Sequence, residues 1–239
     1  MKKTILMMCC ALALSACGDR EAERRAAVAA QATAREEAAA AVAREYDNAV
    51  TARNWEMARV HGAALLSQYP ESQAAGKMKA GYEEVKARGE AAREERRLQG
   101  LWNYAQVADG GGIQRSAMIQ SRDPVDLDGS GAKPVQLVFR DHPEWKRSAY
   151  LVLQAGDFRC PGGCKVKVIA DGGAAKSIDA WRPDTDEAIA MFITSDKALW
   201  KLLRKSKQVS IEFPVKGGGT RTAVFETGGL DGSQMPGWD

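Results

Sequence analysis

The chain has 239 residues, of which 34 are lysine or arginine and 31 are aspartate or glutamate, so its formal net charge is +3. This length is enough for one or two domains. Basic and acidic side chains are thus nearly equal in number, and this balance gives no support for nucleic acid or an acidic polymer as a partner. Alanine, glutamate and arginine dominate before Trp102, whereas glycine, valine, proline and most of the tryptophans come later. This change in composition predicts two kinds of structure in one chain.

The first residues are organised like a secretory signal. Lys2 and Lys3 form a basic start, an apolar run follows from Ile5 to Leu14, and small residues come directly after it. The apolar run is far shorter than the ~20 residues that a membrane-spanning helix requires. We therefore expect residues 1–16 to be an export signal and not a membrane helix.

Leu14-Ser15-Ala16-Cys17 ends this segment and resembles the lipobox of bacterial lipoproteins. The resemblance implies diacylglycerol on the Cys17 thiol, cleavage before Cys17, and a further acyl chain such as palmitate on the new amino terminus. In enteric bacteria, an aspartate directly after the lipidated cysteine favours inner-membrane retention, and this chain has Gly18 there. An outer-membrane anchor on the periplasmic side is expected, with the inner membrane as the alternative. Ordinary signal cleavage beside a chance cysteine is the other interpretation.

Residues 17–36 are expected to form the anchor and a helical spacer. Neither glycine nor proline occurs between Asp19 and Arg53, and alanine, glutamate and arginine are good helix formers. The apolar side chains of the spacer are nearly all alanine, which buries little surface. The composition therefore predicts a mobile helix that holds the folded part away from the membrane.

A helical module is expected over residues 37–100. Apolar residues recur at spacings of three and four on both sides of a turn at Arg53-Asn54. Pro70 ends the second helix, and Ser72 can cap a third that runs towards Leu98. Beyond Val85 this third helix loses its apolar side and becomes a charged connector.

Part of this module, about residues 42–76, resembles a tetratricopeptide-type helical hairpin. The positions that carry the resemblance are Tyr46, Ala49, Trp55, Ala58, Leu65, Tyr69, Pro70 and Ala74. Similar repeats occur in periplasmic lipoproteins that organise envelope machinery. No second copy is visible in the sequence, although such arrays normally contain about three repeats. A generic three-helix hairpin is therefore the equal alternative.

A β-rich domain is expected over residues 101–230, which makes the chain an α+β protein. Short β-branched or aromatic segments separated by Gly, Pro and Asp are typical of an antiparallel β-sandwich or barrel-like domain. The expected strands are 101–107, 113–121, 135–140, 149–154, 165–170, 176–181, 188–193, 208–214 and 220–226. One helix, Lys197–Leu203, is expected to be capped by Ser195. Residues 231–239 are expected to form a loose tail.

Cys160 and Cys164 are the two cysteines that remain after Cys9 and Cys10 are removed with the signal and Cys17 is lipidated. Pro161, Gly162 and Gly163 between them supply turn geometry, which brings the two sulfurs together across a tight hairpin. An exported chain is in an oxidising compartment, so a structural disulfide is expected. A redox-active pair and a metal site are the alternatives, although few further metal ligands exist.

Asp126-Leu-Asp128-Gly-Ser130-Gly131 resembles the first half of an EF-hand calcium loop. It departs from that family at its ninth position, Pro134, and its twelfth, Leu137, where a glutamate is expected. An acidic hairpin loop is therefore the main interpretation, with calcium binding left open.

No residue is assigned a catalytic, cofactor or metal-binding role. The sequence contains no Gly-x-Ser-x-Gly, and neither His61 nor His142 has a local nucleophile or orienting acid. The series of Trp181, strand 188–193, helix 197–203, strand 208–213, Phe225 and Gly229-Leu230 resembles the compact β domain of small exported lipoproteins, including accessory proteins of type VI secretion. That resemblance implies a binding or accessory role.

The sequence as a whole predicts a membrane-anchored, non-enzymatic interaction or accessory module in envelope assembly or secretion. Its partners would be the membrane, through the lipid, and an envelope protein, with no cofactor. A binding face is expected to include Trp145 and the loop Pro161–Gly163. The alternative is a cell-wall or periplasmic enzyme, or an inhibitor of one.

Overall fold

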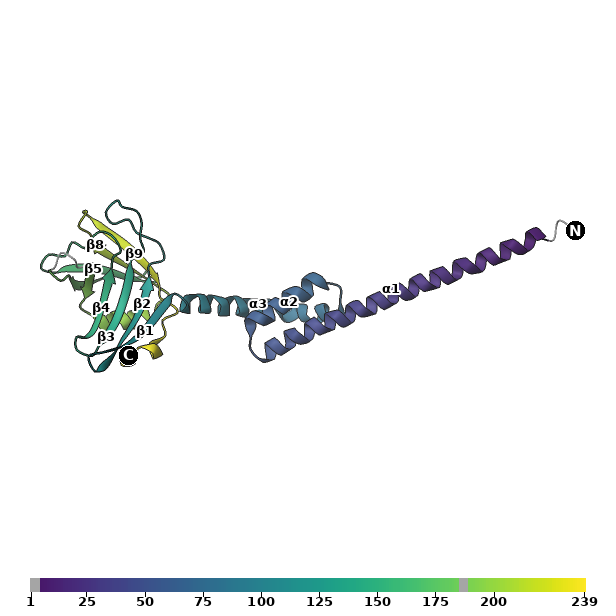
Figure 1. The fold of residues 1–239 in the computed structure, drawn as a ribbon, viewed down its shortest axis with the longest axis horizontal. Coiled ribbons are helices and arrows are strands. Elements are labelled where there is room, and N and C mark those ends of the chain that lie inside the picture. The colour runs from purple at the N-terminus through teal and green to yellow at the C-terminus, as the bar shows by residue number, and fades with distance from the viewer. Residues whose placement is uncertain (1–4, 185–188) are drawn as a thin grey trace. The chain divides into compact units, whose positions relative to one another are not determined.

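The computed structural model describes the backbone of residues 5–184 and 189–239, and the side chains of residues 20–184 and 189–239. It divides into two compact units, Met1–Arg93 and Glu94–Asp239, which we call the helical unit and the β unit (Figure 1). The α+β class expected from the sequence is confirmed. Lys2 and Lys3 of the predicted signal, and Ala188 of a predicted strand, lie outside the described residues.

The helical unit consists of α1 (Ile5–Thr51), α2 (Trp55–Gln68) and most of α3 (Gln73–Gln99), whose last turns belong to the β unit. Side chains from Arg20 to Glu37 of α1 are all exposed, and the first buried side chain is Ala39. Most of the predicted spacer is therefore a helix whose side chains do not contribute to a core. Within the described part of the chain, no helix is long and apolar enough to cross a membrane.

The turn and the cap expected in the helical module are both present. Arg53 has a φ of 54°, and the side chain of Asn54 accepts a hydrogen bond from the Met57 N–H at 3.2 Å. Ser72 Oγ accepts one from the Ala75 N–H at 3.1 Å. Side-chain capping of this kind satisfies N–H groups that a helix start leaves unpaired.

The core of the helical unit forms where the three helices meet. Its buried members are Ala39, Tyr46, Ala49, Ala58, Leu65, Ala75, Met78, Tyr82 and Val85. Gly62 of α2 allows the ring of Tyr82 to approach closely, since a Cβ at position 62 would lie 2.3 Å from that ring. The Tyr82 hydroxyl also donates a hydrogen bond to the carbonyl oxygen of Arg59 at 2.9 Å. The tetratricopeptide resemblance of this hairpin stays a prediction.

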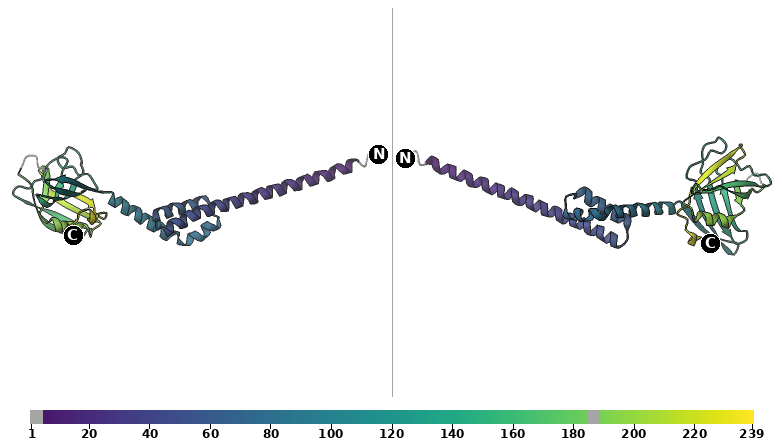
Figure 2. Two further views of the ribbon diagram at one scale, coloured as in Figure 1. Left: turned by 60° about the horizontal axis from the view of Figure 1, so that its bottom comes forward. Right: turned by 180° about the vertical axis from the view of Figure 1, so that it is seen from behind.

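In the β unit, the described residues form one continuous antiparallel sheet of nine strands, in the order β1-β2-β3-β4-β7-β6-β5-β8-β9. The strands are β1 (Trp102–Asp109), β2 (Gly112–Gln120), β3 (Gln136–His142), β4 (Lys146–Val152), β5 (Cys164–Ala170), β6 (Lys176–Trp181), β7 (Ala190–Ile193), β8 (Gln208–Pro214) and β9 (Thr220–Glu226). They curve around a common interior (Figures 1 and 2). Just beyond β2, the Arg122 N–H donates to the Val224 carbonyl of β9 at 2.7 Å, which links two distant parts of the sheet.

Alternation along each strand divides the sheet into an inner and an outer face, because successive side chains point to opposite sides. β8 shows this most simply: Val209, Ile211 and Phe213 are buried, while the residues between them are partly exposed. The helix α4 (Asp196–Leu203) adds Leu199, Trp200 and Leu203 to the same core. Ser195 stands at the cap position of α4, but its side chain makes no capping hydrogen bond, contrary to the prediction.

The prediction of a loose tail over residues 231–239 is wrong. The short 3₁₀ helix η1 (Gly232–Gln234) leads into Met235 and Trp238, which are 1% and 0% exposed. The Trp238 ring meets Phe139 at 5.4 Å between centroids and Trp200 at 5.3 Å. The tail packs because its two large apolar side chains complete the core of the sheet. The segment is rich in Gly and Pro and has no strand or helix period that would indicate this.

Candidate interaction surfaces

The outer face of the β unit carries a row of aromatic and basic side chains that crosses four adjacent strands, β3, β4, β7 and β6. Tyr150 of β4 lies directly opposite Phe192 of β7, which in turn lies opposite Trp181 of β6. Their sequence neighbours Leu151 and Met191 are fully buried in the core. The three rings therefore point away from the core.

These rings contact one another across the strands. Trp181 stacks on Phe192 with the ring centroids 4.6 Å apart and an interplanar angle of 15°. Phe192 and Tyr150 are 5.1 Å apart at an angle of 41°. Burial is the main cause that raises the pKa of the Tyr150 hydroxyl, and the positive charge of Arg140 opposes it. The Tyr150 hydroxyl therefore remains neutral across the physiological range.

The row continues through Arg140, whose Cζ atom lies 5.4 Å from the Tyr150 ring and 5.3 Å from the Trp145 ring. Trp145 stacks in turn on His142 at 4.1 Å and 15°. We call this set the aromatic–arginine ladder; its members are His142, Trp145, Arg140, Tyr150, Phe192 and Trp181. Cation–π contacts of this kind contribute about 0.5–1 kcal/mol each at exposed sites.

His142 fixes the turn that presents Trp145. Its Nδ1 accepts hydrogen bonds from the backbone N–H groups of Glu144 at 3.1 Å and Trp145 at 3.2 Å. Since Nδ1 is the acceptor, Nε2 carries the hydrogen and donates it to Asp109 at 2.9 Å. The ring is thus held at both nitrogens, and the exposed Trp145 is stacked on a fixed support.

A groove of about 700 Å³ opens beside the ladder. Its lining includes Arg140, Trp145, Arg147, Trp181, Phe192 and Asp196. Trp145 and Trp181 remain 63% and 46% exposed, which is unusual for such large apolar side chains. Exposed apolar patches with a polar rim are typical of binding surfaces.

Two polar atoms in the groove form no hydrogen bond with any residue that the structure describes. Arg140 and Ser148 lie opposite each other on β3 and β4, and the Arg140 Nε and Ser148 Oγ atoms are both buried without a hydrogen bond. Within the described part of the chain, the Arg140 guanidinium forms no hydrogen bond or ion pair. Arg147, by comparison, lies 3.5 Å from the Asp141 carboxylate.

That Trp145 and Pro161–Gly163 belong to a binding face stays a prediction. Trp145 is exposed, as predicted, and it lines the groove, whereas Pro161–Gly163 is not among the lining residues. The prediction did not include Arg140, Tyr150, Phe192 or Trp181. Only the cross-strand register brings them together, and spacing along the sequence carries no signal of it.

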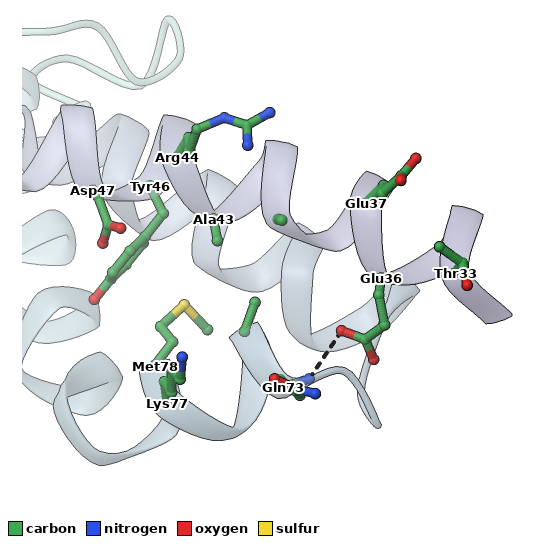
Figure 3. A pocket seen from close by; sticks show the side chains of 12 residues that line it. Thr33, Glu36, Glu37, Ala43, Arg44, Tyr46, Asp47, Gln73, Lys77 and Met78 are labelled. Carbon is green, nitrogen blue, oxygen red and sulfur yellow. Dashed lines mark hydrogen bonds between the residues drawn. The ribbon is translucent and has the colours of Figure 1, made fainter.

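A second groove, of about 730 Å³, lies in the helical unit between α1 and α3 (Figure 3). Glu36 closes one end by accepting a hydrogen bond from the Gln73 N–H at 3.2 Å. Tyr46 and Met78 point into it, and burial, followed by the nearby charge of Asp47, raises the pKa of the Tyr46 hydroxyl. Its charged lining is mixed, with Arg44 and Lys77 alongside the acids. It shows no preference for one charge.

Cys160 and Cys164 are joined by a disulfide, with their Cα atoms 5.0 Å apart. Cys160 is buried, and the Cys164 sulfur lies 3.6 Å from the Met191 sulfur in the core. The bond therefore ties the hairpin before β5 to the interior of the sheet.

Reduction of this bond is expected to lower the free energy of unfolding by about 2 kcal/mol, because the loop that it closes is short. Urea unfolding of the protein and of a Cys160→Ser/Cys164→Ser variant would measure the difference. Intact mass after alkylation without reductant should show neither Cys160 nor Cys164 labelled. Two labelled thiols at these positions in freshly purified native protein would contradict the disulfide.

The acidic loop 126–131 is held by its own side chains. Asp126 Oδ1 accepts a hydrogen bond from the Gly129 N–H at 2.8 Å, and Asp128 Oδ1 accepts one from the Ser130 N–H at 2.9 Å. Hydrogen bonds from Ser130, its side chain first, lower the pKa of the Asp128 carboxyl. Within the residues that the structure describes, no group of three or more His, Cys, Asp or Glu is placed to hold a metal ion. The contacts are those of a polar hairpin loop.

Comparison with known proteins gives little. No family model matches the chain. No curated protein matches it either. Among solved structures, the crystal structure of invasion associated protein B from Bartonella henselae is similar, with 14% sequence identity and a TM-score of 0.37. The match covers 54% of this chain and 85% of that chain.

Proposed function

We propose that this protein is a lipid-anchored lipoprotein that faces the periplasm and acts as a non-enzymatic interaction module in envelope assembly or secretion. The observation that carries the proposal is the aromatic–arginine ladder, since one sheet face carries two exposed tryptophans and a guanidinium with no hydrogen bond or ion pair to any described residue. Tryptophan and arginine are the side chains most enriched among binding hot spots. The proposed location is the outer membrane, with the inner membrane as the alternative.

Two features support the anchor. The motif ending at Cys17 resembles a lipobox, and the exposed part of α1 from Arg20 to Glu37 follows shortly after it. At 1.5 Å per residue, this helical stretch is about 27 Å long. It is suited to act as a spacer between a lipid and a folded module, because it buries none of its side chains.

Site-specific photo-cross-linking in the bacterium tests the proposal. A benzoylphenylalanine at Trp145, in the acylated full-length protein, is expected to capture one envelope protein. The matched control is the same probe at Lys165, an exposed side chain on β5 outside the ladder. Equal cross-linking from both positions, or recovery of peptidoglycan fragments without any protein, would count against an interaction module.

A further inference from the structure

We infer that the aromatic–arginine ladder binds an extended acidic peptide segment of a partner protein, which deepens the proposed function and rests on it. The ligand class follows from four properties: the state of Arg140, the orientation of the rings, the charges that line the groove and the distance that the row covers.

The guanidinium of Arg140 is placed to bind an anion. It sits between the rings of Tyr150 and Trp145 and has no hydrogen-bond or ion-pair partner within the described residues. A guanidinium offers five N–H donors in a planar fork that matches a carboxylate. The Ser148 Oγ atom, on the residue opposite Arg140, also has no hydrogen-bond partner within the described residues.

The rings favour an anion over an uncharged sugar. Stacking along the row uses ring faces, as between Trp181 and Phe192 and between His142 and Trp145. These stacks cover ring faces, so the ring edges, which carry the positive end of the aromatic quadrupole, contribute to the exposed surface. A sugar would need free ring faces for stacking, whereas a carboxylate is attracted to the edges and to Arg140.

The charged side chains that line the groove also favour an anionic ligand. Among the described residues, Arg140 and Arg147 line it together with one carboxylate, that of Asp196, which already accepts a hydrogen bond from the Lys197 N–H at 2.6 Å. Arg147 already forms an ion pair with Asp141. Arg140 thus remains the basic group available to a ligand.

The length of the row sets the size of the segment. Four adjacent strands are separated by three spacings of about 4.8 Å, so the ladder spans about 14 Å. An extended chain rises about 3.3 Å per residue, which gives four or five residues. Because the row runs across the strands, such a peptide would be held by its side chains and not by pairing with a strand edge.

Fluorescence polarisation with the detergent-solubilised full-length protein tests this inference. The probe is fluorescein-labelled Glu-Leu-Glu-Leu-Glu with an amidated C-terminus, whose three side-chain carboxylates lie on one face when it is extended. It should bind about tenfold more tightly than the neutral Gln-Leu-Gln-Leu-Gln peptide, as a charge-assisted hydrogen bond predicts. Its affinity should fall as salt is added.

The Arg140→Gln variant should weaken binding of the acidic peptide about tenfold. The matched control is Arg159→Gln, the same change at an exposed arginine outside the ladder, which should leave affinity within about twofold. Trp181→Leu provides a second test at an exposed side chain, and the near-ultraviolet circular dichroism of each variant reports whether it is folded.

Equal affinity for the acidic and neutral peptides, or unchanged binding by folded Arg140→Gln, would overturn the inference. So would Arg140-dependent binding of chitohexaose or phosphatidylglycerol vesicles without peptide binding, which would identify a glycan or a membrane surface instead. Cross-linking from Trp145 together with failure of the peptide assay would reject the acidic occupant alone. Loss of both results would reject the interaction module as well.

Discussion

Replacement of Cys17 by serine is expected to abolish labelling of the protein by a palmitate analogue and to release it from the membrane fraction. The proposed modification needs a thiol sulfur to carry diacylglycerol, and a serine oxygen is not a substitute in the lipobox. Each buried CH₂ of an acyl chain contributes about 0.8 kcal/mol to membrane binding, so the loss of several chains removes stable anchoring. Membrane fractionation and in-gel detection of the label measure both effects.

The control for this experiment is a Cys9→Ser/Cys10→Ser variant, which makes the same chemical change inside the predicted signal. It should be labelled as strongly as the unaltered protein, because those two cysteines are expected to be removed with residues 1–16. Persistent labelling of Cys17→Ser would overturn the anchor, and with it the proposed location.

The Trp238→Ala variant is expected to destabilise the β unit by about 3–5 kcal/mol, the usual cost of removing a buried aromatic side chain. Trp238 is completely buried, and its ring meets both Phe139 and Trp200 edge-on or tilted. The truncation would leave a cavity between β3 and α4 that neither ring can fill. Thermal unfolding followed by circular dichroism should show a melting temperature roughly 10 °C lower or more.

Trp145→Ala makes the same truncation at a side chain that is 63% exposed. It should cost no more than about 1–1.5 kcal/mol, because it loses a stack on His142 and a contact with Arg140 but opens no cavity. Similar losses in the two variants would mean that the tail is not part of the core.

Most of the secondary structure could be predicted from the sequence, because periodicity is a local property. The change from a period of 3.6 to a period of 2 after Gly100 predicts where the helices end, and the β-branched segments predict all nine strands. The strand order could not be predicted. β5 lies between β6 and β8, and β7 between β4 and β6, through contacts that depend on the whole chain.

The candidate site was less predictable for the same reason. Arg140 faces Tyr150 and Trp145 only because of the β3–β4 register, and Phe192 joins them through the pairing of β4 with β7. A shift of one residue would turn these side chains into the core. Trp238 escaped prediction differently: its flanking Pro236 and Gly237 are typical of a loop, and tertiary packing overrides that local signal.

The buried Trp238 also affects the order in which the β unit can fold. The core around Phe139 and Trp200 is complete only when residue 238 is available, and all of the strands precede that residue in the chain. On the proposed export route, the chain would therefore cross the inner membrane before this core is complete, and strands that have not yet paired would expose their edges. Such edges are prone to aggregate, so the transport period is when this protein most needs a holding chaperone.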